Sequence, residues 1–363
     1  MTWMITERAD WTIARVPGHS ATMAAAPLPL LDATWLAHRY DPGHDAFHFR
    51  RVARDAHRAA TFLTDEYLGA DPAPPLVVRR ADARAAAPAA APLHWIFHSA
   101  FCCSTLLARA MDRPGAALGL KEPVVLNDLI GWRRRGEPGP DLAAVLDDTL
   151  ALLARPFAPG EAVVVKPSTI ANGFAPALLT LRPDSVALLL YAPLPTYLAS
   201  VAKKELEGRL WVRTLLAGML DDGLARFGHD SRALFALTDL QVAALGWLGQ
   251  HRLFAELVAR FGAARVRTLD SATLMADPRA ALVALAALYR LRLDDAALDS
   301  IVAGPAFTRH SKFGNAFDAA ARAAEHRDAA TLHAREIEVV VRWAEQVAAT
   351  FGVAMTPPAP LLD

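Results

Sequence analysis

The chain has 363 residues, 53% of them hydrophobic, so it can bury a large core as one α/β domain or two smaller ones. Its 38 basic and 38 acidic side chains cancel, which excludes a global field that would draw it to nucleic acid or to an anionic membrane. No stretch approaches the roughly 18 uncharged apolar residues of a membrane span. We therefore expect a soluble protein whose anion sites, if any, are local.

The two cysteines are adjacent, at Cys102 and Cys103, and provide no disulfide framework. This usage predicts a reducing, cytoplasmic environment. Residues 1–10, MTWMITERAD, contain acidic side chains and no long apolar core, so we expect no secretory signal there. Two neighbouring cysteines without a convergent histidine or cysteine pair also lack the spacing of a zinc site, and we expect no metal.

Residues 1–92 are predicted to form an N-terminal extension that packs on the core. Within it, residues 46–68 carry apolar side chains at helical spacing and are predicted to form a helix. The extension ends in a stretch rich in proline and alanine, residues 70–93, which is typical of a connection. The main domain is therefore predicted to span residues 93–363.

From residue 93 onward, strand patterns alternate with helix patterns. Continuous apolar runs, typical of buried parallel strands, occupy residues 93–98, 162–166, 186–191 and 265–269. Helical patterns lie between and after them, including residues 280–291 and 332–351. This order predicts a three-layer α/β/α fold with a mainly parallel central sheet. In such folds the ligand and the chemistry lie at the carboxyl edge of the sheet.

Residues 93–109, LHWIFHSAFCCSTLLAR, have the shape of a phosphate-binding loop. An apolar strand breaks into small residues and resumes as a helix at Ser104 and Thr105. Backbone N–H groups at a helix start lack intrahelical partners, and the helix dipole adds partial positive charge there. We expect Cys102, Cys103, Ser104 and Thr105 to bind an anionic group.

The consensus of nucleotide kinases and ATPases, G-x-x-x-x-G-K-[ST], fits this segment poorly. When Thr105 takes the last position, His98 and Cys103 replace the glycines and Ser104 replaces the lysine. Loss of the lysine argues against triphosphate chemistry more than against phosphate binding as such. A left-handed backbone at Cys103 would cost about 1–3 kcal/mol. The alternative interpretation is an ordinary strand–turn–helix unit in which Ser104 caps the helix.

Five segments in order resemble the bacterial sulfotransferase family, which uses 3′-phosphoadenosine 5′-phosphosulfate (PAPS) as its sulfuryl donor. They are residues 93–109, LKEPVVLNDL (120–129), VVVKPS (163–168), VALLLYAPLPTYLASVAKK (186–204) and VRTLDSATLMADPRAALVALAALYRL (266–291). The resemblance covers roughly residues 93–352. It implies a P-loop fold, PAPS as co-substrate, and a small-molecule or peptide acceptor, without nucleic-acid or membrane partners.

The resemblance also implies catalytic roles. Many members carry a loop lysine at the position of Phe101, so the cation must come from elsewhere, and Lys166 or Lys121 is the candidate, with Arg109 in reserve. Glu122 is the expected base, because some branches of the family use a glutamate after the loop. His98 is the rival base, since its ordinary pKa suits proton transfer near neutrality.

The family binds the donor's 3′-phosphate with an arginine and, eight residues later, a serine. Ser200 matches the serine and is expected at a helix start, but the arginine position is Ala192. Arg309 or Lys312, in the loop FTRHSKFGN, is the candidate replacement. Gly208 is predicted to interrupt the helix that follows Ser200, which leaves a bent gate or an exposed charged helix as alternatives.

Three functions therefore remain open. The first is a PAPS-dependent sulfotransferase acting on an unidentified hydroxyl or amine. The second is a P-loop phosphotransferase that uses a nucleoside triphosphate. The third is a nucleotide-binding protein that has lost catalysis through Phe101, Cys103 and Ala192.

Overall fold

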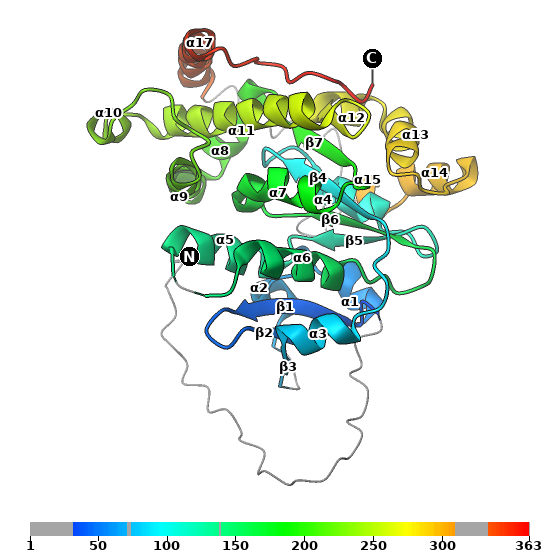
Figure 1. Ribbon diagram of the computed structural model, residues 1–363. Coiled ribbons are helices and arrows are strands. Elements are labelled where there is room, and N and C mark those ends of the chain that lie inside the picture. The colour runs from blue at the N-terminus through cyan, green and yellow to red at the C-terminus, as the bar shows by residue number, and fades with distance from the viewer. Residues whose placement is uncertain (1–31, 71–73, 138, 309–332, 363) are drawn as a thin grey trace, which may run out of the picture.

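The computed structural model describes residues 32–70, 74–137, 139–308 and 333–362 (Figure 1). Their core is a five-stranded parallel sheet in the order β5-β6-β4-β7-β8. Its strands are β4 (Leu93–His98), β5 (Ala117–Lys121), β6 (Ala162–Lys166), β7 (Ala187–Tyr191) and β8 (Val266–Asp270). The fold is the predicted α/β architecture with a parallel central sheet. The four expected strands are confirmed to within one residue, and β5 is an additional strand that the sequence pattern did not reveal.

Helices cover both faces of this sheet, which is why every residue of β4 through β7 is buried (Figure 1). Ile96 points to one face and Trp95 and Phe97 to the other, as strand geometry requires. A larger group of helices lies on the Ile96 side of the sheet, some packed on the sheet and others on neighbouring helices. They are α4 (Ser104–Met111), α8 (Leu194–Lys203), α9 (Glu205–Asp221), α10 (Ser231–Phe235), α11 (Asp239–Phe261), α12 (Ser271–Ala276), α13 (Pro278–Leu288), α14 (Asp295–Val302), α15 (Pro305–Thr308) and α17 (Ala334–Phe351). Those on the Trp95 face are α5 (Val124–Arg135), α6 (Leu142–Leu153), η1 (Thr169–Phe174) and α7 (Ala175–Leu181).

Close packing of α4 on β5 depends on Gly119. A Cβ atom on this glycine would lie 2.5 Å from the backbone oxygen of Ala108 in α4. Only glycine therefore lets the helix after the loop approach the strand that ends beside Glu122. This approach brings the start of α4 and the end of β5 to the same edge of the sheet.

The N-terminal segment forms an antiparallel sheet in the order β1-β2-β3, beneath α5 and α6 in Figure 1. Its elements are β1 (Trp35–Asp41), β2 (Ala46–Arg51), α1 (Arg54–Ala59), α2 (Asp65–Leu68), β3 (Leu76–Arg79) and α3 (Arg80–Ala86). The helix predicted over residues 46–68 is wrong for residues 46–51, which form β2, and only the short helices α1 and α2 occur in the rest of that range. Phe47 and Phe49 are both fully buried, so the segment begins with the two-residue period of a strand, and pairing with β1 and β3 decides its structure.

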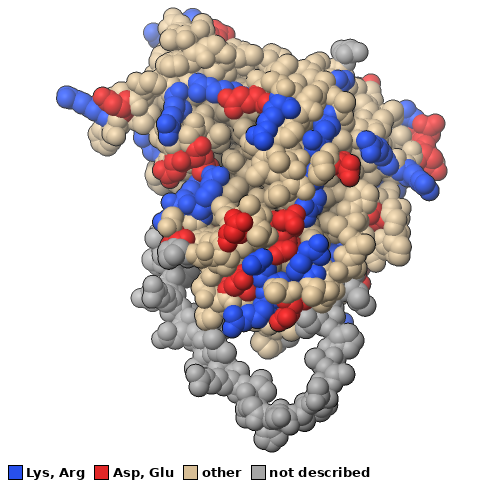
Figure 2. Space-filling view, in the orientation of Figure 1, with Lys and Arg blue, Asp and Glu red and all other residues tan. Residues whose placement is uncertain are grey.

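Charged side chains of both signs are interspersed over the face seen in Figure 2, and neither sign forms a broad patch on it. Among the described helices, none is both long enough and apolar enough to cross a membrane.

Candidate active site

The loop between β4 and α4 has an unusual backbone. Ala100, Phe101 and Cys103 have φ values of +68°, +52° and +64°, a region that favours glycine. Each such residue costs about 1–2 kcal/mol, and this strain concentrates at binding and catalytic sites. Cys103 thus has the left-handed conformation whose cost the sequence analysis considered. Because α4 begins directly after it, the unpaired first N–H groups of the helix lie at the carboxyl edge of the sheet.

A buried polar network holds this loop from three sides. The backbone N–H of Ala192, after β7, donates to Ser99 Oγ at 3.2 Å, and Gln250 of α11 reaches the Ser99 carbonyl at 3.5 Å. The side-chain amide of Asn172, in η1, donates to the His98 carbonyl and to Gln250 Oε1, both at 2.9 Å. Sequence analysis missed Asn172 and Gln250. The one available signal was a polar side chain shortly after the strand at residues 162–166.

His98 is part of the same network. Its Nδ1 accepts a hydrogen bond from the Ala100 N–H at 3.1 Å, while its Nε2 lies 3.0 Å from the carbonyl oxygen of Pro167. These contacts require a neutral ring with its proton on Nε2. The Thr169 hydroxyl lies 3.3 Å from Nδ1 as well. Both ring nitrogens thus serve to shape the loop, which favours a positioning role for His98 over proton transfer.

Glu122 and Lys166 meet at the ends of β5 and β6. The Lys166 ammonium donates to Glu122 Oε1, and the Glu122 N–H donates to the Lys166 carbonyl at 2.7 Å. The Lys166 side chain is 1% exposed and that of Glu122 is 17% exposed. Glu122 has a φ of +52°, a further strained residue at this edge. The Glu122 carboxylate is thus partly exposed to solvent, while the Lys166 ammonium that it pairs with is buried.

Lys166 also lies close to the loop between β4 and α4, which has the shape of a phosphate-binding loop. Burial raises the pKa of the Cys102 thiol to about 12, and the charge of Lys166 acts in the opposite direction. The Cys102 thiol itself points into the core, where it donates to the Leu190 carbonyl at 3.4 Å. The expected contribution of Cys102 to anion binding is therefore limited to its backbone.

The two alternative cations point elsewhere. Lys121 is fully buried, and its ammonium donates to the carbonyls of His57 at 2.7 Å and Arg58 at 3.1 Å, at the end of α1. Burial lowers its pKa to about 7, with the nearby charge of Arg109 adding to the effect. Arg109 donates to the Ala59 carbonyl at 3.3 Å. Both cations cap α1, so Lys166 is the candidate cation that contacts the expected base, Glu122.

Phe101 occupies the loop position at which the family's lysine would stand. Its ring centroid lies 5.3 Å from that of Trp211 in α9 and 5.7 Å from that of Tyr197 in α8. Full burial raises the pKa of Tyr197 well above its ordinary value. The loop is thus tied to α8 and α9 by aromatic packing in place of a charge.

The sequence predicted Ser200 at a helix start, and this prediction is wrong. Helix α8 begins at Leu194, so Ser200 lies in its second turn. Its hydroxyl donates to the Thr196 carbonyl at 2.9 Å. The chain turns at Lys204, not at Gly208, which lies inside α9. A Cβ on Gly208 would lie 2.5 Å from the Val201 carbonyl oxygen, so this glycine permits close packing of α9 on α8.

Arg309 and Lys312, the expected partners of the 3′-phosphate, lie outside the described residues. The Ser200 hydroxyl forms its hydrogen bond within α8. The structure therefore brings together His98, residues 102–105, Glu122 and Lys166.

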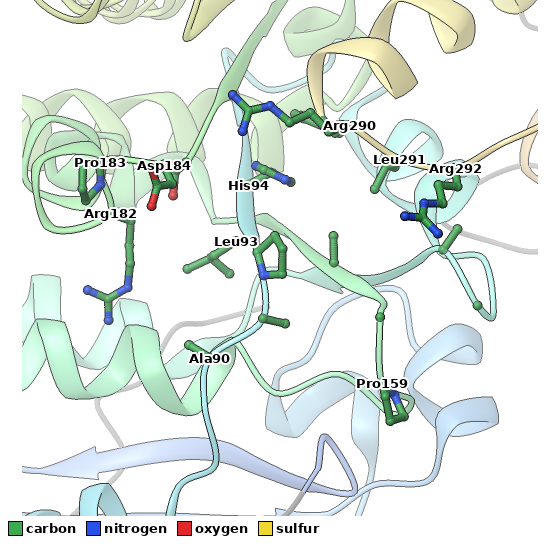
Figure 3. Close-up of a pocket in the computed structure, with 18 residues that line it drawn as sticks. Ala90, Leu93, His94, Pro159, Arg182, Pro183, Asp184, Arg290, Leu291 and Arg292 are labelled. Atoms are coloured by element: carbon green, nitrogen blue, oxygen red, sulfur yellow. The ribbon is translucent and has the colours of Figure 1, made fainter.

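A cavity of about 920 Å³ lies at the opposite edge of the sheet (Figure 3). Its walls include Leu93 and Ala162, the first residues of β4 and β6, together with Arg182, Arg290 and Arg292. It is therefore separate from the site at the carboxyl edge. Within the described parts of the chain, no three His, Cys, Asp or Glu side chains are grouped so that they could hold a metal ion.

No family model matches the chain, and no curated protein matches it. Among solved structures it is similar to the sulfotransferase domain of the Synechococcus olefin synthase, with 14% identity, a TM-score of 0.40, and coverage of 73% of this chain and 96% of that one. It is similar to sulfotransferase STF1 of Mycobacterium tuberculosis, with 14% identity, a TM-score of 0.38, and coverage of 60% and 72%. A third similar structure is the sulfotransferase domain of the curacin biosynthetic pathway, with 11% identity, a TM-score of 0.41, and coverage of 74% and 100%.

Proposed function

We propose that this protein is a sulfotransferase that moves a sulfuryl group from PAPS to the hydroxyl or amine of an acceptor. One observation carries the proposal: the Glu122–Lys166 pair ends two neighbouring strands at the same sheet edge as the start of α4. An anion-binding helix start, a buried cation and a carboxylate are thus combined in one place. The ordered resemblance of residues 93–352 supports the same reading.

The residues present fit the donor in kind. Sulfuryl transfer requires positioning and charge neutralisation more than covalent catalysis by the protein. The first N–H groups of α4, with Ser104 and Thr105, supply donors for the 5′-phosphosulfate. Lys166 supplies a charge that acts strongly because it is buried. Ser200, Arg309 and Lys312 are our proposed partners of the 3′-phosphate.

Glu122 is the proposed base. Its carboxylate accepts the proton of the acceptor hydroxyl while that oxygen forms a bond to sulfur and the bond from sulfur to the bridging phosphate oxygen breaks. The leaving phosphate oxygen keeps the electron pair, and Lys166 offsets the developing negative charge. The free thiols of Cys102 and Cys103 favour a reducing cytoplasm for this activity.

A second candidate is a nucleotide-binding protein without catalysis. The packing of Phe101 between Tyr197 and Trp211 favours it, because an apolar ring fills the place of the family's loop lysine. Ala192, buried where the family has an arginine, favours it as well. In this case the loop would still bind a nucleotide, and Glu122 would have no effect on a reaction.

The test measures thermal stability with excess 3′-phosphoadenosine 5′-phosphate, ATP or AMP, with and without magnesium, followed by sulfuryl transfer from labelled PAPS. A ligand at about 100 times its Kd adds about 2.7 kcal/mol, which moves Tm by a couple of degrees. We expect stabilisation by the 3′-phosphorylated nucleotide alone. Stabilisation by magnesium–ATP alone would support a phosphotransferase and refute the proposal. Nucleotide binding without transfer to any acceptor would support the non-catalytic candidate.

A further inference from the structure

We propose that the cavity at the amino edge of the sheet is a second binding site, which takes a small organic anion with an apolar body. This inference does not depend on the proposed sulfuryl transfer, because the cavity lies at the opposite end of the strands from Glu122 and Lys166. Its volume of about 920 Å³ lies within the range of roughly 300–1,000 Å³ that is typical of small-molecule sites.

The walls of the cavity come from segments that are far apart in the sequence (Figure 3). Residues 90–92 and the first residues of β4 and β6 form a mostly apolar floor. The turn before β7, residues 182–185, forms one side, and the turn after α13, residues 289–292, forms another. Folding thus builds a concave surface with an apolar floor and polar sides.

Two arginines on the turn after α13 carry charges that the described chain does not neutralise. Neither Arg290 nor Arg292 forms an ion pair or a side-chain hydrogen bond with another described residue. Arg182, on the turn before β7, is paired with Asp147 and also donates to its carbonyl at 2.7 Å. Among the described residues that line the cavity, Asp184 is the one acid, and it lies across the cavity from Arg292 in Figure 3. Positive charge is therefore in excess.

Arg290 occupies a backbone position that favours glycine. It follows the last turn of α13 with a φ of +55°. Its N–H donates to the Ala287 carbonyl at 3.1 Å, and the Leu291 N–H donates to the Ala286 carbonyl at 2.9 Å. This pair of hydrogen bonds is the Schellman motif, in which the left-handed residue is usually glycine. The arginine therefore strains the turn, and no contact of its guanidinium with a described residue offsets the strain, as expected of a side chain that serves a ligand.

Buried polar groups lie beside these arginines. The His94 ring is stacked on Tyr289, with centroids 5.2 Å and planes 2° apart. Burial lowers the pKa of His94 to about 4, and the charge of Arg290 lowers it further, so the ring is neutral at pH 7 and the arginine lies near it. Ser185, 3% exposed, also lines the cavity, and its hydroxyl has no hydrogen-bond partner. A ligand oxygen that accepts from this hydroxyl would remove the cost of leaving it unpaired.

The chemistry of these groups defines the ligand. Planar guanidinium groups bind oxyanions such as carboxylate, sulfonate, sulfate and phosphate through paired hydrogen bonds. The floor, which includes Pro92, Ala116 and Ala162, suits an uncharged apolar body. An inorganic anion would leave this floor uncovered, and a cation would be repelled by the arginines. The site therefore fits an organic anion better than a free phosphate or sulfate ion.

The test measures binding of naphthalene-2-sulfonate to the full chain by equilibrium dialysis. Naphthalene-2-sulfonamide is the neutral probe of similar shape, and we expect it to bind at least about tenfold more weakly. Inorganic sulfate should displace the labelled sulfonate only at a concentration at least about tenfold higher than unlabelled sulfonate requires. Excess 3′-phosphoadenosine 5′-phosphate should not displace it, because that nucleotide is proposed to bind at the carboxyl edge.

Two variants separate a ligand contact from damage to the fold. Arg290→Gly should weaken sulfonate binding at least about tenfold and should not lower Tm, because glycine adopts the φ of +55° without strain. Arg292→Gln should weaken binding by a similar factor. The control is Arg279→Gln, also on α13, where the arginine is paired with Asp295 and Asp299. This variant should bind the sulfonate as the unmodified chain does.

Four results would overturn the inference. The sulfonate would fail to bind at millimolar concentration, or the two naphthalene probes would bind equally. Alternatively, Arg290→Gly or Arg292→Gln would bind normally, or the nucleotide would displace the probe and so place it at the carboxyl edge. Displacement by inorganic sulfate as readily as by the sulfonate would show that the floor adds nothing, and would overturn the assignment to organic anions. These outcomes are read at the amino edge, so they stand whether or not the chain transfers sulfuryl groups.

Discussion

Lys166, which is buried, donates its ammonium hydrogen bond to Glu122 across the ends of β6 and β5, while the Glu122 backbone donates back to the Lys166 carbonyl. The two residues are 44 positions apart in the sequence. Their pairing places a partly exposed carboxylate on a buried cation at the edge where α4 begins.

Glu122→Gln should lower sulfuryl transfer by at least about 100-fold, because the amide keeps a hydrogen bond to Lys166 but accepts no proton. Binding of 3′-phosphoadenosine 5′-phosphate should change by less than about threefold. Single-turnover rates and equilibrium binding check the two halves. Glu137→Gln, at an exposed pair with Arg135, is the control. A normal rate in Glu122→Gln would remove Glu122 as the base.

Cys103→Gly should raise the free energy of unfolding by about 0.5–1 kcal/mol, since glycine adopts the observed φ of +64° without strain. Cys103→Val should lower it, because a branched side chain is strained most in this region. Ser104→Gly is the matched comparison: the neighbouring residue is helical, and glycine there should destabilise. Urea unfolding measures all three. A loss of stability in Cys103→Gly would contradict the strain assigned to the loop.

Asn172→Leu and Gln250→Leu should each cost about 1–3 kcal/mol of stability, because each leaves buried polar groups of the loop unpaired. The double variant should show a coupling of about 0.5–3 kcal/mol, as expected for side chains in contact. Both single variants should also weaken nucleotide binding. Gln346→Leu, exposed on α17, serves as the control and should change neither quantity. Strictly additive losses would mean that the two amides do not act as one network.

Stability should fall in mild acid because of three buried histidines. Burial is the main cause that lowers the pKa of His57 and His94 to about 4 and that of His251 to about 3. The unfolded chain takes up protons near pH 6.5 and the folded chain does not, so stability is full above pH 6.5 and declines below it. The loss at pH 5 is about 2 kcal/mol for each histidine, and it levels off near pH 4 for His57 and His94 and near pH 3 for His251.

Urea unfolding at pH 8, 6 and 5 checks this prediction. His94→Gln is the informative variant, since its amide oxygen can still accept the Val186 N–H that Nδ1 accepts at 3.4 Å. Its loss of stability between pH 8 and pH 5 should be smaller than that of the unmodified chain by about 2 kcal/mol. An unchanged pH dependence would show that His94 does not titrate as proposed.

The sequence by itself determined the parallel sheet and the position of the loop. Continuous apolar runs such as residues 93–98 need cover on both faces of a sheet. This need is visible in one short segment of the sequence, and the folded strand is indeed buried throughout. The helix start at Ser104 was also predicted from the sequence, because it depends on neighbouring residues, whereas the left-handed backbone of Cys103 was only a possibility. The strand at residues 46–51 was not predicted, since a short apolar segment takes its structure from its partners β1 and β3.

Only the tertiary structure decided which side chains meet. The sequence offered Lys166 or Lys121 as the cation, with Arg109 in reserve, and in the folded chain Lys121 and Arg109 donate to backbone carbonyls of α1. Asn172 and Gln250 became partners only when η1 and α11 closed on the loop. Such contacts join residues far apart in the chain, and because side-chain direction and burial arise only on packing, no local pattern encodes them.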